Sequence, residues 1–590
     1  MNSCNRNFSS IVVDGNDRAP NRSMLRAVGF EDEDFEKPQV AVCSAWSMVT
    51  PCNSHLDELG KASVEGVDQA GGKAVPFGTI TVSDGISMGT PGMRYSLVSR
   101  EVIADSIETV VGAEGMDGLV AIGGCDKNMP ACVMALARLN RPGIFVYGGT
   151  ILPGLHKEKN LDIVSVFEAV GSHAGGVIDK EELTAIEKKA IPGPGSCGGM
   201  YTANTMSSAI EALGMSLPGG AIIPAPYKER EIISFETGKR IVEMVHEDLT
   251  PSKIMTKKAF ENAIYVASAI GASSNCPPHL TAIARHMGID FGIDNWEKLG
   301  HDIPLLVNCQ PAGEHLMEGF FKAGGIPAIM QELMKNNKLH KDLMTVTGKT
   351  IAENLIEKID IDENIIKSFK NPLVNNAGFI VMKSNFFNSA VMKTSVISSE
   401  FRKRYLSNPT SLNLFEANAV VFEGPEDYHL RINDESLNID ENSILMIRGC
   451  GPVGYPGSAE VVNMQPPDKL LKQGINTLPT LGDGRQSGTS ESPSILNVSP
   501  ESAIGGSLLI VETGDKIKID LNNSRIDLMI SSEEIEKRRK KVKIPKLENQ
   551  TPWQEISRKM VGQLETGACL ETETLYLDIT NTKGMPRHSH

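Results

Sequence analysis

The chain has 590 residues, 41% of them hydrophobic and 22% charged, a formal net charge of −15 and an isoelectric point near 5.4. This composition is ordinary for a soluble globular protein, and the excess of negative charge argues against nucleic acid or an anionic membrane as a partner. Because a single hydrophobic core stops growing at about 250–300 residues, the length predicts at least two domains.

No segment of the sequence has the composition of a membrane span or a secretory signal. No stretch approaches the roughly 18 uninterrupted apolar residues of a spanning helix, and residues 1–6 lack the apolar core of a signal peptide. The ten cysteines include no Cys-x-x-Cys pair, so they do not have the pattern of a disulfide framework or a zinc ribbon. Reduced thiols predict a cytoplasmic protein.

The first two-thirds of the chain alternate short β-branched runs with helical stretches. Buried strands are predicted at residues 40–42, 118–122 and 143–147, and helices with small-residue faces at 201–215 and 256–269. Strands that alternate with helices are typical of a parallel sheet with crossover helices. We therefore predict an α/β fold for the N-terminal domain.

The pattern changes near residue 379, after which predicted strands follow one another with turn residues between them. These strands are expected at 419–422, 443–447 and 508–512, with Gly514–Asp515 as a hairpin turn leading into 516–521. The pattern predicts a smaller, β-rich C-terminal domain with a boundary at 370–377, giving domains of 1–375 and 376–590. The charged tract 532–543 is predicted to be a solvent-exposed helix.

The run Gly123-Gly124-Cys125-Asp126-Lys127-Asn128-Met129-Pro130 follows directly after the predicted strand 118–122. Ligands of open α/β sheets bind at the carboxyl ends of the strands, and the two glycines allow a tight turn and close approach of a bound group. Thiolates suit iron–sulfur clusters and carboxylates suit Mg²⁺, so Cys125 beside Asp126 indicates two different metals. The alternative is a buried cysteine at a strand end followed by a solvated Asp–Lys pair.

Two glycine-containing patterns imitate nucleotide sites without meeting their requirements. Gly193-x-Gly195-x-x-Gly198 has the spacing of a dinucleotide fingerprint, but Pro192 precedes it and Pro194 and a central cysteine lie within it. Thr347-Gly348-Lys349-Thr350 is similar to the end of a phosphate-binding loop, but the first glycine of that loop is replaced by Leu343. A nucleotide-dependent oxidoreductase is therefore not supported.

Two further cysteines lie in equally unusual settings: Cys52 in Val49-Thr50-Pro51-Cys52-Asn53-Ser54-His55-Leu56, and Cys197 in Gly195-Ser196-Cys197-Gly198-Gly199-Met200-Tyr201. With the Cys125 motif, these residues resemble the dihydroxy-acid and sugar-acid dehydratase family, nearly end to end. The resemblance implies a barrel-like second domain and a [2Fe–2S] cluster held by Cys52, Cys125 and Cys197. Three protein ligands leave one iron position open, which lets that iron act as a Lewis acid. The other seven cysteines, including Cys132, are predicted to be packing or surface residues.

The resemblance also implies a Mg²⁺ site. Asp84 lies in Thr81-Val82-Ser83-Asp84-Gly85-Ile86-Ser87-Met88-Gly89-Thr90 and Glu460 in Gly454-Tyr455-Pro456-Gly457-Ser458-Ala459-Glu460. With Asp126 they would supply three hard oxygen ligands, although each acid taken singly is a turn residue or a helix cap. In the family the lysine that matches Lys127 is carbamylated, which replaces a cation by an oxygen donor. The alternative is an ion pair between Lys127 and Asp126.

Ser487, in Gly482-Asp483-Gly484-Arg485-Gln486-Ser487-Gly488-Thr489, matches the catalytic base of the family. Serine is a poor base unless a nearby cation lowers its pKa. The resemblance implies that Ser487, as an alkoxide near Mg²⁺, removes the C2 proton of a 2,3-dihydroxy acid while the C3 hydroxyl leaves. The enol that results tautomerises to a 2-oxo-3-deoxy acid. Arg485 is expected to fix the loop or neutralise charge, and it receives no catalytic role.

Two branches of the family share the resemblance. Residues up to about 220 resemble the branched-chain dihydroxy-acid dehydratases, whereas residues 421–429, 454–460 and 586–590 resemble the aldonate dehydratases. We expect a sugar acid such as xylonate, arabinonate or gluconate, with 2,3-dihydroxyisovalerate of valine and isoleucine biosynthesis as the alternative. A non-catalytic iron–sulfur sensor would lack a ligand or the base, and every such position is filled. Relatives form homodimers or homotetramers, which the resemblance implies here too.

Overall fold

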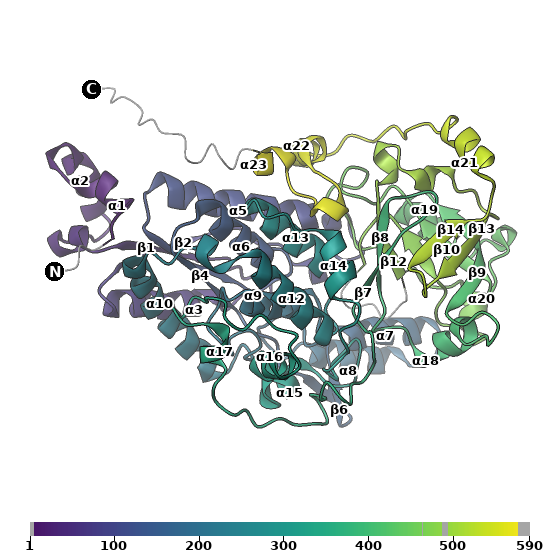
Figure 1. The fold of residues 1–590 in the computed structure, drawn as a ribbon, viewed down its shortest axis with the longest axis horizontal. Coiled ribbons are helices and arrows are strands. Elements are labelled where there is room, and N and C mark those ends of the chain that lie inside the picture. The colour runs from purple at the N-terminus through teal and green to yellow at the C-terminus, as the bar shows by residue number, and fades with distance from the viewer. Residues whose placement is uncertain (1–4, 463, 487–493, 576–590) are drawn as a thin grey trace.

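The structure, a computed structural model, describes residues 5–462, 464–486 and 494–575 (Figure 1). The short helices α1 (Ser9–Val13) and α2 (Ala19–Arg26) lie at one end of the molecule, an α/β domain fills the middle and a β-rich domain forms the other end. The predicted fold class is confirmed in both parts. None of the described helices is both long and apolar enough to cross a membrane.

A four-stranded parallel sheet forms the core of the N-terminal domain. Its order is β2 (Lys73–Gly78), β1 (Gln39–Ser44), β3 (Gly118–Gly123) and β4 (Gly143–Tyr147). The three strands predicted from apolar runs are β1, β3 and β4. Both β3 and β4 are buried along their whole length, as continuous apolar runs require when helices cover both faces of a sheet.

Helices pack on both faces of this sheet. α3 (Leu56–Gln69) and α10 (Lys228–Glu247) lie together on one face, and α5 (Ser96–Ala113) and α6 (Asn128–Leu139) on the other. The predicted helices at 201–215 and 256–269 are α9 (Thr202–Ala212) and α12 (Lys257–Ala269), which extend the core together with α13 (Cys276–His286) and α16 (Gly325–Lys335).

The C-terminal domain is an eight-stranded sheet that nearly closes into a barrel. Its order is β14 (Arg525–Leu528), β13 (Lys516–Asp520), β9 (Leu414–Phe422), β10 (Ser443–Ile447), β11 (Thr480–Gly482), β12 (Ser494–Ser499), β8 (Ser389–Lys393) and β7 (Phe379–Met382). Lys383 N donates to Ser524 O at 2.9 Å and Ile526 N donates to Lys383 O at 3.0 Å, which joins the two edges. The predicted boundary at 370–377 is kept as a proposal.

One predicted strand is wrong. Residues 508–512 do not form a strand, because the segment is a 3-10 helix at Ser507–Ile510. A short apolar run does not distinguish a strand from a buried helical turn, and Arg448 Nη1 donates to Leu508 O at 2.8 Å and Val511 O at 3.1 Å, so these carbonyls pair with a side chain instead of a strand. The hairpin is formed instead by β13 and β14. Within the charged tract 532–543 the predicted helix is present as α21 (Ser532–Arg539), but it ends at Arg539 instead of residue 543.

Candidate functional site

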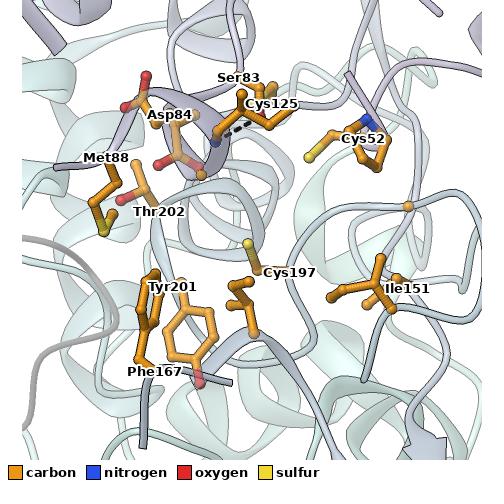
Figure 2. Close-up of a pocket in the computed structure, with 17 residues that line it drawn as sticks. Cys52, Ser83, Asp84, Met88, Cys125, Ile151, Phe167, Cys197, Tyr201 and Thr202 are labelled. Atoms are coloured by element: carbon orange, nitrogen blue, oxygen red, sulfur yellow. Dashed lines mark hydrogen bonds between the residues drawn. The ribbon is translucent and has the colours of Figure 1, made fainter. Parts of the chain in front are cut away.

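The loops that follow the four parallel strands meet around one cavity of about 220 Å³ (Figure 2). Cys52 follows β1, Asp84 follows β2, and Cys125 with Asp126 comes directly after β3. Cys197 lies in a loop that pairs with the segment after β4, where Ile151 N donates to Ser196 O at 2.7 Å. The structure therefore brings together all three predicted cysteines and two of the predicted acids at the carboxyl edge of the sheet, where ligands of such folds bind.

Backbone contacts hold the three cysteine loops against one another. Gly195 N donates to Pro51 O at 3.1 Å, which joins the Cys197 loop to the Cys52 loop. Ser196 Oγ donates to Gly124 O, which joins the same loop to the Cys125 turn. A Cβ on Gly124 would lie 2.3 Å from Cys52 O, so only glycine permits this approach.

The three thiols share an environment that suits metal binding. The Cys52 thiol is hydrogen-bonded with Cys125, and this bond together with burial raises the pKa of Cys52 well above its usual range. Burial and the Asp126 carboxylate raise the pKa of Cys197 in the same direction. A metal that binds here must displace thiol protons. By contrast, Cys132 is buried within α6 and does not line the cavity, in keeping with a packing role.

Three carboxylates gather beside the cavity, and two of them, Asp84 and Asp126, line it. Asp84, Asp126 and Glu460 each offer an oxygen within 4.8 Å of the other two, and Glu460 comes from the C-terminal domain. Asp84 Oδ2 accepts from Ser96 Oγ at 2.9 Å and from Lys127 Nζ, whereas Asp84 Oδ1 is buried without a partner among the described residues. An unsatisfied buried acceptor is costly, and a hard cation would satisfy it, so this donor set fits Mg²⁺.

Lys127 lies among these acids with 1% of its side chain exposed. Its Nζ contacts Asp84 most closely, Glu460 at 3.6 Å and Asp126 at 4.0 Å, so the simple ion pair with Asp126 does not describe it. Burial opposes the charged amine, but the carboxylates outweigh burial and raise the pKa of Lys127. Burial also raises the pKa of Asp126 to about 7, reinforced by Asp84 and Glu460 and opposed by Lys127.

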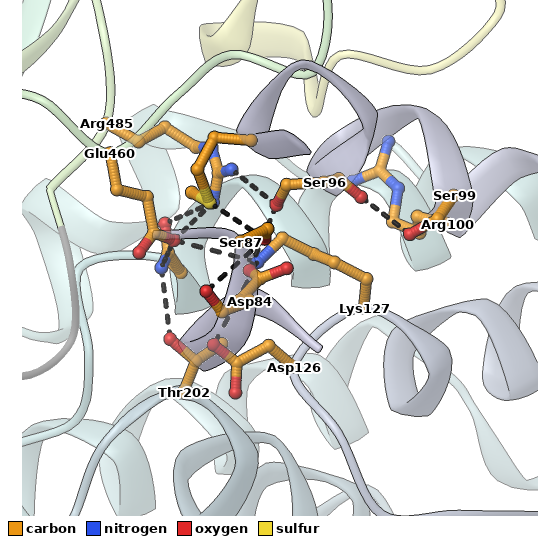
Figure 3. Close-up of polar contacts among 12 residues, drawn as sticks. Asp84, Ser87, Ser96, Ser99, Arg100, Asp126, Lys127, Thr202, Glu460 and Arg485 are labelled. Carbon is orange, nitrogen blue, oxygen red and sulfur yellow. Dashed lines mark hydrogen bonds and ion pairs between the residues drawn. The ribbon is translucent and has the colours of Figure 1, made fainter. Parts of the chain in front are cut away.

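Two polar residues complete the carboxylate group (Figure 3): Arg485, which was expected to fix its loop or neutralise charge, and Asn275, which the sequence did not assign. Arg485, which is completely buried, donates to Glu460 Oε1 at 2.7 Å, and Asn275 Nδ2 donates to the same oxygen at 2.6 Å. Asn275 directly precedes α13, and no spacing in the sequence relates it to residue 460. Ser487 and the tail 586–590 lie outside the described residues, so their predicted roles stay predictions.

Much of the remaining lining of the cavity is apolar. Its side chains come from the helical turn after Asp84 and from the segments that surround Cys197: Ile86, Met88, Ile151, Ile163, Phe167 and Ile191. Phe167 and Ile191 remain 43% and 37% exposed, so part of this wall faces outward. Nothing in the periodicity of the sequence marked these residues as one surface.

Known proteins resemble this chain over nearly its whole length. The N-terminal dihydroxy-acid/6-phosphogluconate dehydratase family model matches residues 37–354 and the C-terminal model matches 364–568. The D-xylonate dehydratase of Caulobacter vibrioides is 46% identical over 557 residues, which cover 94% of this chain and 92% of that protein. The dihydroxy-acid dehydratase of Methylococcus capsulatus is 48% identical over 536 residues, which cover 90% and 92%. A dihydroxy-acid dehydratase of Staphylococcus saprophyticus is 45% identical over 563 residues, which cover 95% and 97%.

Proposed function

This chain belongs to the dihydroxy-acid/6-phosphogluconate dehydratase family, and we propose that it removes water from a 2,3-dihydroxy carboxylic acid to give a 2-oxo-3-deoxy acid. One observation carries the proposal: Cys52, Cys125 and Cys197 line the same cavity as Asp84 and Asp126. Soft and hard ligand sets on one cavity suit a substrate with two oxygens to be polarised on adjacent carbons.

The side chains fit two metal centres. Cys52, Cys125 and Cys197 would hold a [2Fe–2S] cluster with one open iron position. The carboxylates that gather around Lys127 would hold Mg²⁺, with Lys127 as a further oxygen donor once carbamylated. When bound, the two centres supply Lewis acids to the C2 and C3 oxygens of the substrate.

The protein's own residues carry the proton and fix the ligands. Ser96 and Arg485 each hold one oxygen of a carboxylate. The proposed base, Ser487, follows Arg485 by two residues in the sequence. In the proposed reaction the C2 proton passes to the Ser487 alkoxide and the C3–O bond breaks. The departing hydroxide takes up the proton that Ser487 then holds and leaves as water, which regenerates the alkoxide. The enol then tautomerises to the 2-oxo acid.

The described wall of the cavity favours a substrate with a short aliphatic chain. Six apolar side chains would surround the substituent at C3, where each buried methylene gains about 0.8 kcal/mol and a hydroxyl without a partner loses about 1–3 kcal/mol. We therefore place 2,3-dihydroxyisovalerate first. This order differs from the preference for an aldonate in the sequence analysis.

A sugar acid is the second candidate function. The segments 421–429 and 454–460 resemble those of aldonate dehydratases, and Glu460 itself ends the second of them. Xylonate, arabinonate or gluconate would carry hydroxyl groups along C4 and beyond, which need polar partners. Such partners would have to come from residues other than the described apolar wall.

The test is a substrate panel with anaerobically purified enzyme. Formation of 2-oxo acid is followed with 2,3-dihydroxyisovalerate, xylonate, arabinonate and gluconate, and kcat/KM is compared. Ser487→Ala is expected to lose roughly 10²- to 10⁴-fold in kcat, the usual contribution of a general base, while the exposed Ser436→Ala keeps full activity. Asp84→Asn should lose the response to Mg²⁺ and keep the visible absorbance of the cluster.

Two results would count against the proposal. Wild-type enzyme that carries iron but produces no 2-oxo acid from any of the four substrates would reject the dehydratase reaction. Activity of Ser487→Ala within a few-fold of wild type would reject the base while leaving the reaction standing. A clear preference for an aldonate would reject the aliphatic assignment alone.

A further inference from the structure

Arg485 contacts Glu460 directly and Asp84 through Ser96. Its Nε donates to Ser458 O at 2.8 Å, and its Nη1 donates to Glu460 Oε1 at 2.7 Å and to Asn275 Oδ1 at 3.0 Å. Its Nη2 lies 3.3 Å from both Ser96 Oγ and Gly457 O (Figure 3). The side chain is completely buried. One guanidinium therefore joins the loops of the C-terminal domain to the first residue of α5 and to the residue that precedes α13.

These contacts hold one oxygen of each of two carboxylates, and the two carboxylates come from different domains. Among the described residues, both hydrogen bonds to Glu460 fall on Oε1, one from Arg485 and one from Asn275. On Asp84, Oδ2 accepts from Ser96 Oγ, and Ser96 in turn faces Arg485. Asp84 Oδ1 is buried and has no hydrogen-bond partner in the part of the chain that the structure describes. One oxygen of each acid is thus anchored, and the other is left for a cation.

We propose that Arg485 is a positioning residue that fixes the free oxygens of Asp84 and Glu460 in the geometry a divalent cation needs. The inference rests on the proposed function, because it assumes that these acids bind the metal. The planar guanidinium fork suits the task, since its donors point in fixed directions. Mg²⁺ demands nearly ideal octahedral geometry, so a shift of either carboxylate weakens binding.

Positioning and a purely electrostatic role of Arg485 predict opposite changes in cation affinity. Arg485 places a positive charge beside a cation site, and like charges repel. If charge were its main contribution, Arg485→Gln would tighten divalent-cation binding. Positioning predicts weaker binding in Arg485→Gln and also in Arg485→Lys, which keeps the charge but loses the fork. The sign of the change in Arg485→Gln therefore separates the two roles.

The experiment titrates Mn²⁺ into full-length, cluster-containing protein freed of Mg²⁺, with free Mn²⁺ measured by electron paramagnetic resonance. We expect Mn²⁺ to bind at least tenfold more weakly in Arg485→Gln and Arg485→Lys, and several-fold more weakly in Ser96→Ala, with the cluster absorbance unchanged. Arg431→Gln is the matched control, because Arg431 forms an ion pair with Asp427 on the surface of the same domain. That variant should bind Mn²⁺ like wild type.

Wild-type or tighter Mn²⁺ binding by Arg485→Gln would overturn the positioning role. Should both Arg485 variants fail to fold, Ser96→Ala decides, and wild-type Mn²⁺ affinity in that variant would equally overturn the proposal. Glu460→Gln tests the premise separately. If it binds the same number of Mn²⁺ ions as wild type with the same affinity, the metal assignment of the proposed function is wrong and the role of Arg485 falls with it.

Discussion

Replacing Gly124 by alanine tests how closely the Cys52 and Cys125 loops must approach. The added Cβ would lie 2.3 Å from Cys52 O, whereas real Cβ atoms essentially never come closer than 3.0 Å, so the two backbones must separate by at least 0.7 Å. Both contacting atoms belong to the backbone or to Cβ, and no flexible side chain can yield instead. Overpacking of this kind costs about 1–3 kcal/mol.

We expect this separation to affect the proposed iron–sulfur cluster most. Cys52 and Cys125 are hydrogen-bonded thiols in adjacent loops, and iron–sulfur ligation needs all three sulfurs in place. We expect Gly124→Ala to retain its secondary structure, unfold at lower urea concentration and lose most of its iron and sulfide. The measurements are iron and sulfide content per chain, visible absorbance after anaerobic reconstitution, and urea unfolding followed by circular dichroism.

Gly112→Ala is the matched control. Gly112 lies in the exposed part of α5, and a Cβ there meets no atom within 4 Å. Because alanine is favoured over glycine inside a helix by about 1 kcal/mol, this variant should be as stable as wild type or more so, with full iron content. A Gly124→Ala protein with the iron content and spectrum of wild type would refute the steric reasoning.

Three further predictions concern the proposed cluster, the buried carboxyl group of Glu501 and assembly. Cys197→Ser should lose the visible absorbance and Cys132→Ser should keep it; a full spectrum in Cys197→Ser contradicts the three-cysteine assignment. Burial and Asp483 raise the pKa of Glu501 from 4.5 to about 7, so protonated Glu501 stabilises the fold at low pH and this contribution is lost as pH rises to about 7. Relative to Glu501→Gln, wild type should lose about 3 kcal/mol of unfolding free energy between pH 4.5 and 7 in urea titrations. A difference in unfolding free energy between the two proteins that stays constant with pH would contradict the raised pKa of Glu501. Light scattering should show a dimer or tetramer, and an active monomer would be the contrary result.

The sequence by itself determined the elements whose pattern is local. The apolar runs of β1, β3 and β4 predicted buried parallel strands, because strands covered on both faces cannot alternate polar and apolar residues. The motif at residues 123–130, directly after β3, indicated a metal-binding site, because a cysteine and an aspartate side by side at the end of a strand offer ligands for two kinds of metal. The resemblance then supplied Cys52, Cys197, Asp84 and Glu460, and the structure brought the cysteines to the cavity and the two acids to the carboxylate group.

Only the tertiary structure decided the contacts between segments far apart in the chain. Asn275 and Glu460 are 185 residues apart, and Arg485 and Ser96 are 389 apart; no local pattern relates them, because their meeting depends on how the two domains pack. The apolar residues of the run 508–512 fit a strand and a buried helical turn equally well. The helical turn is decided by Arg448, which donates hydrogen bonds to two carbonyl groups of this segment. The apolar wall of the cavity was likewise invisible, since its six side chains come from separate loops and helices that share a surface only after folding.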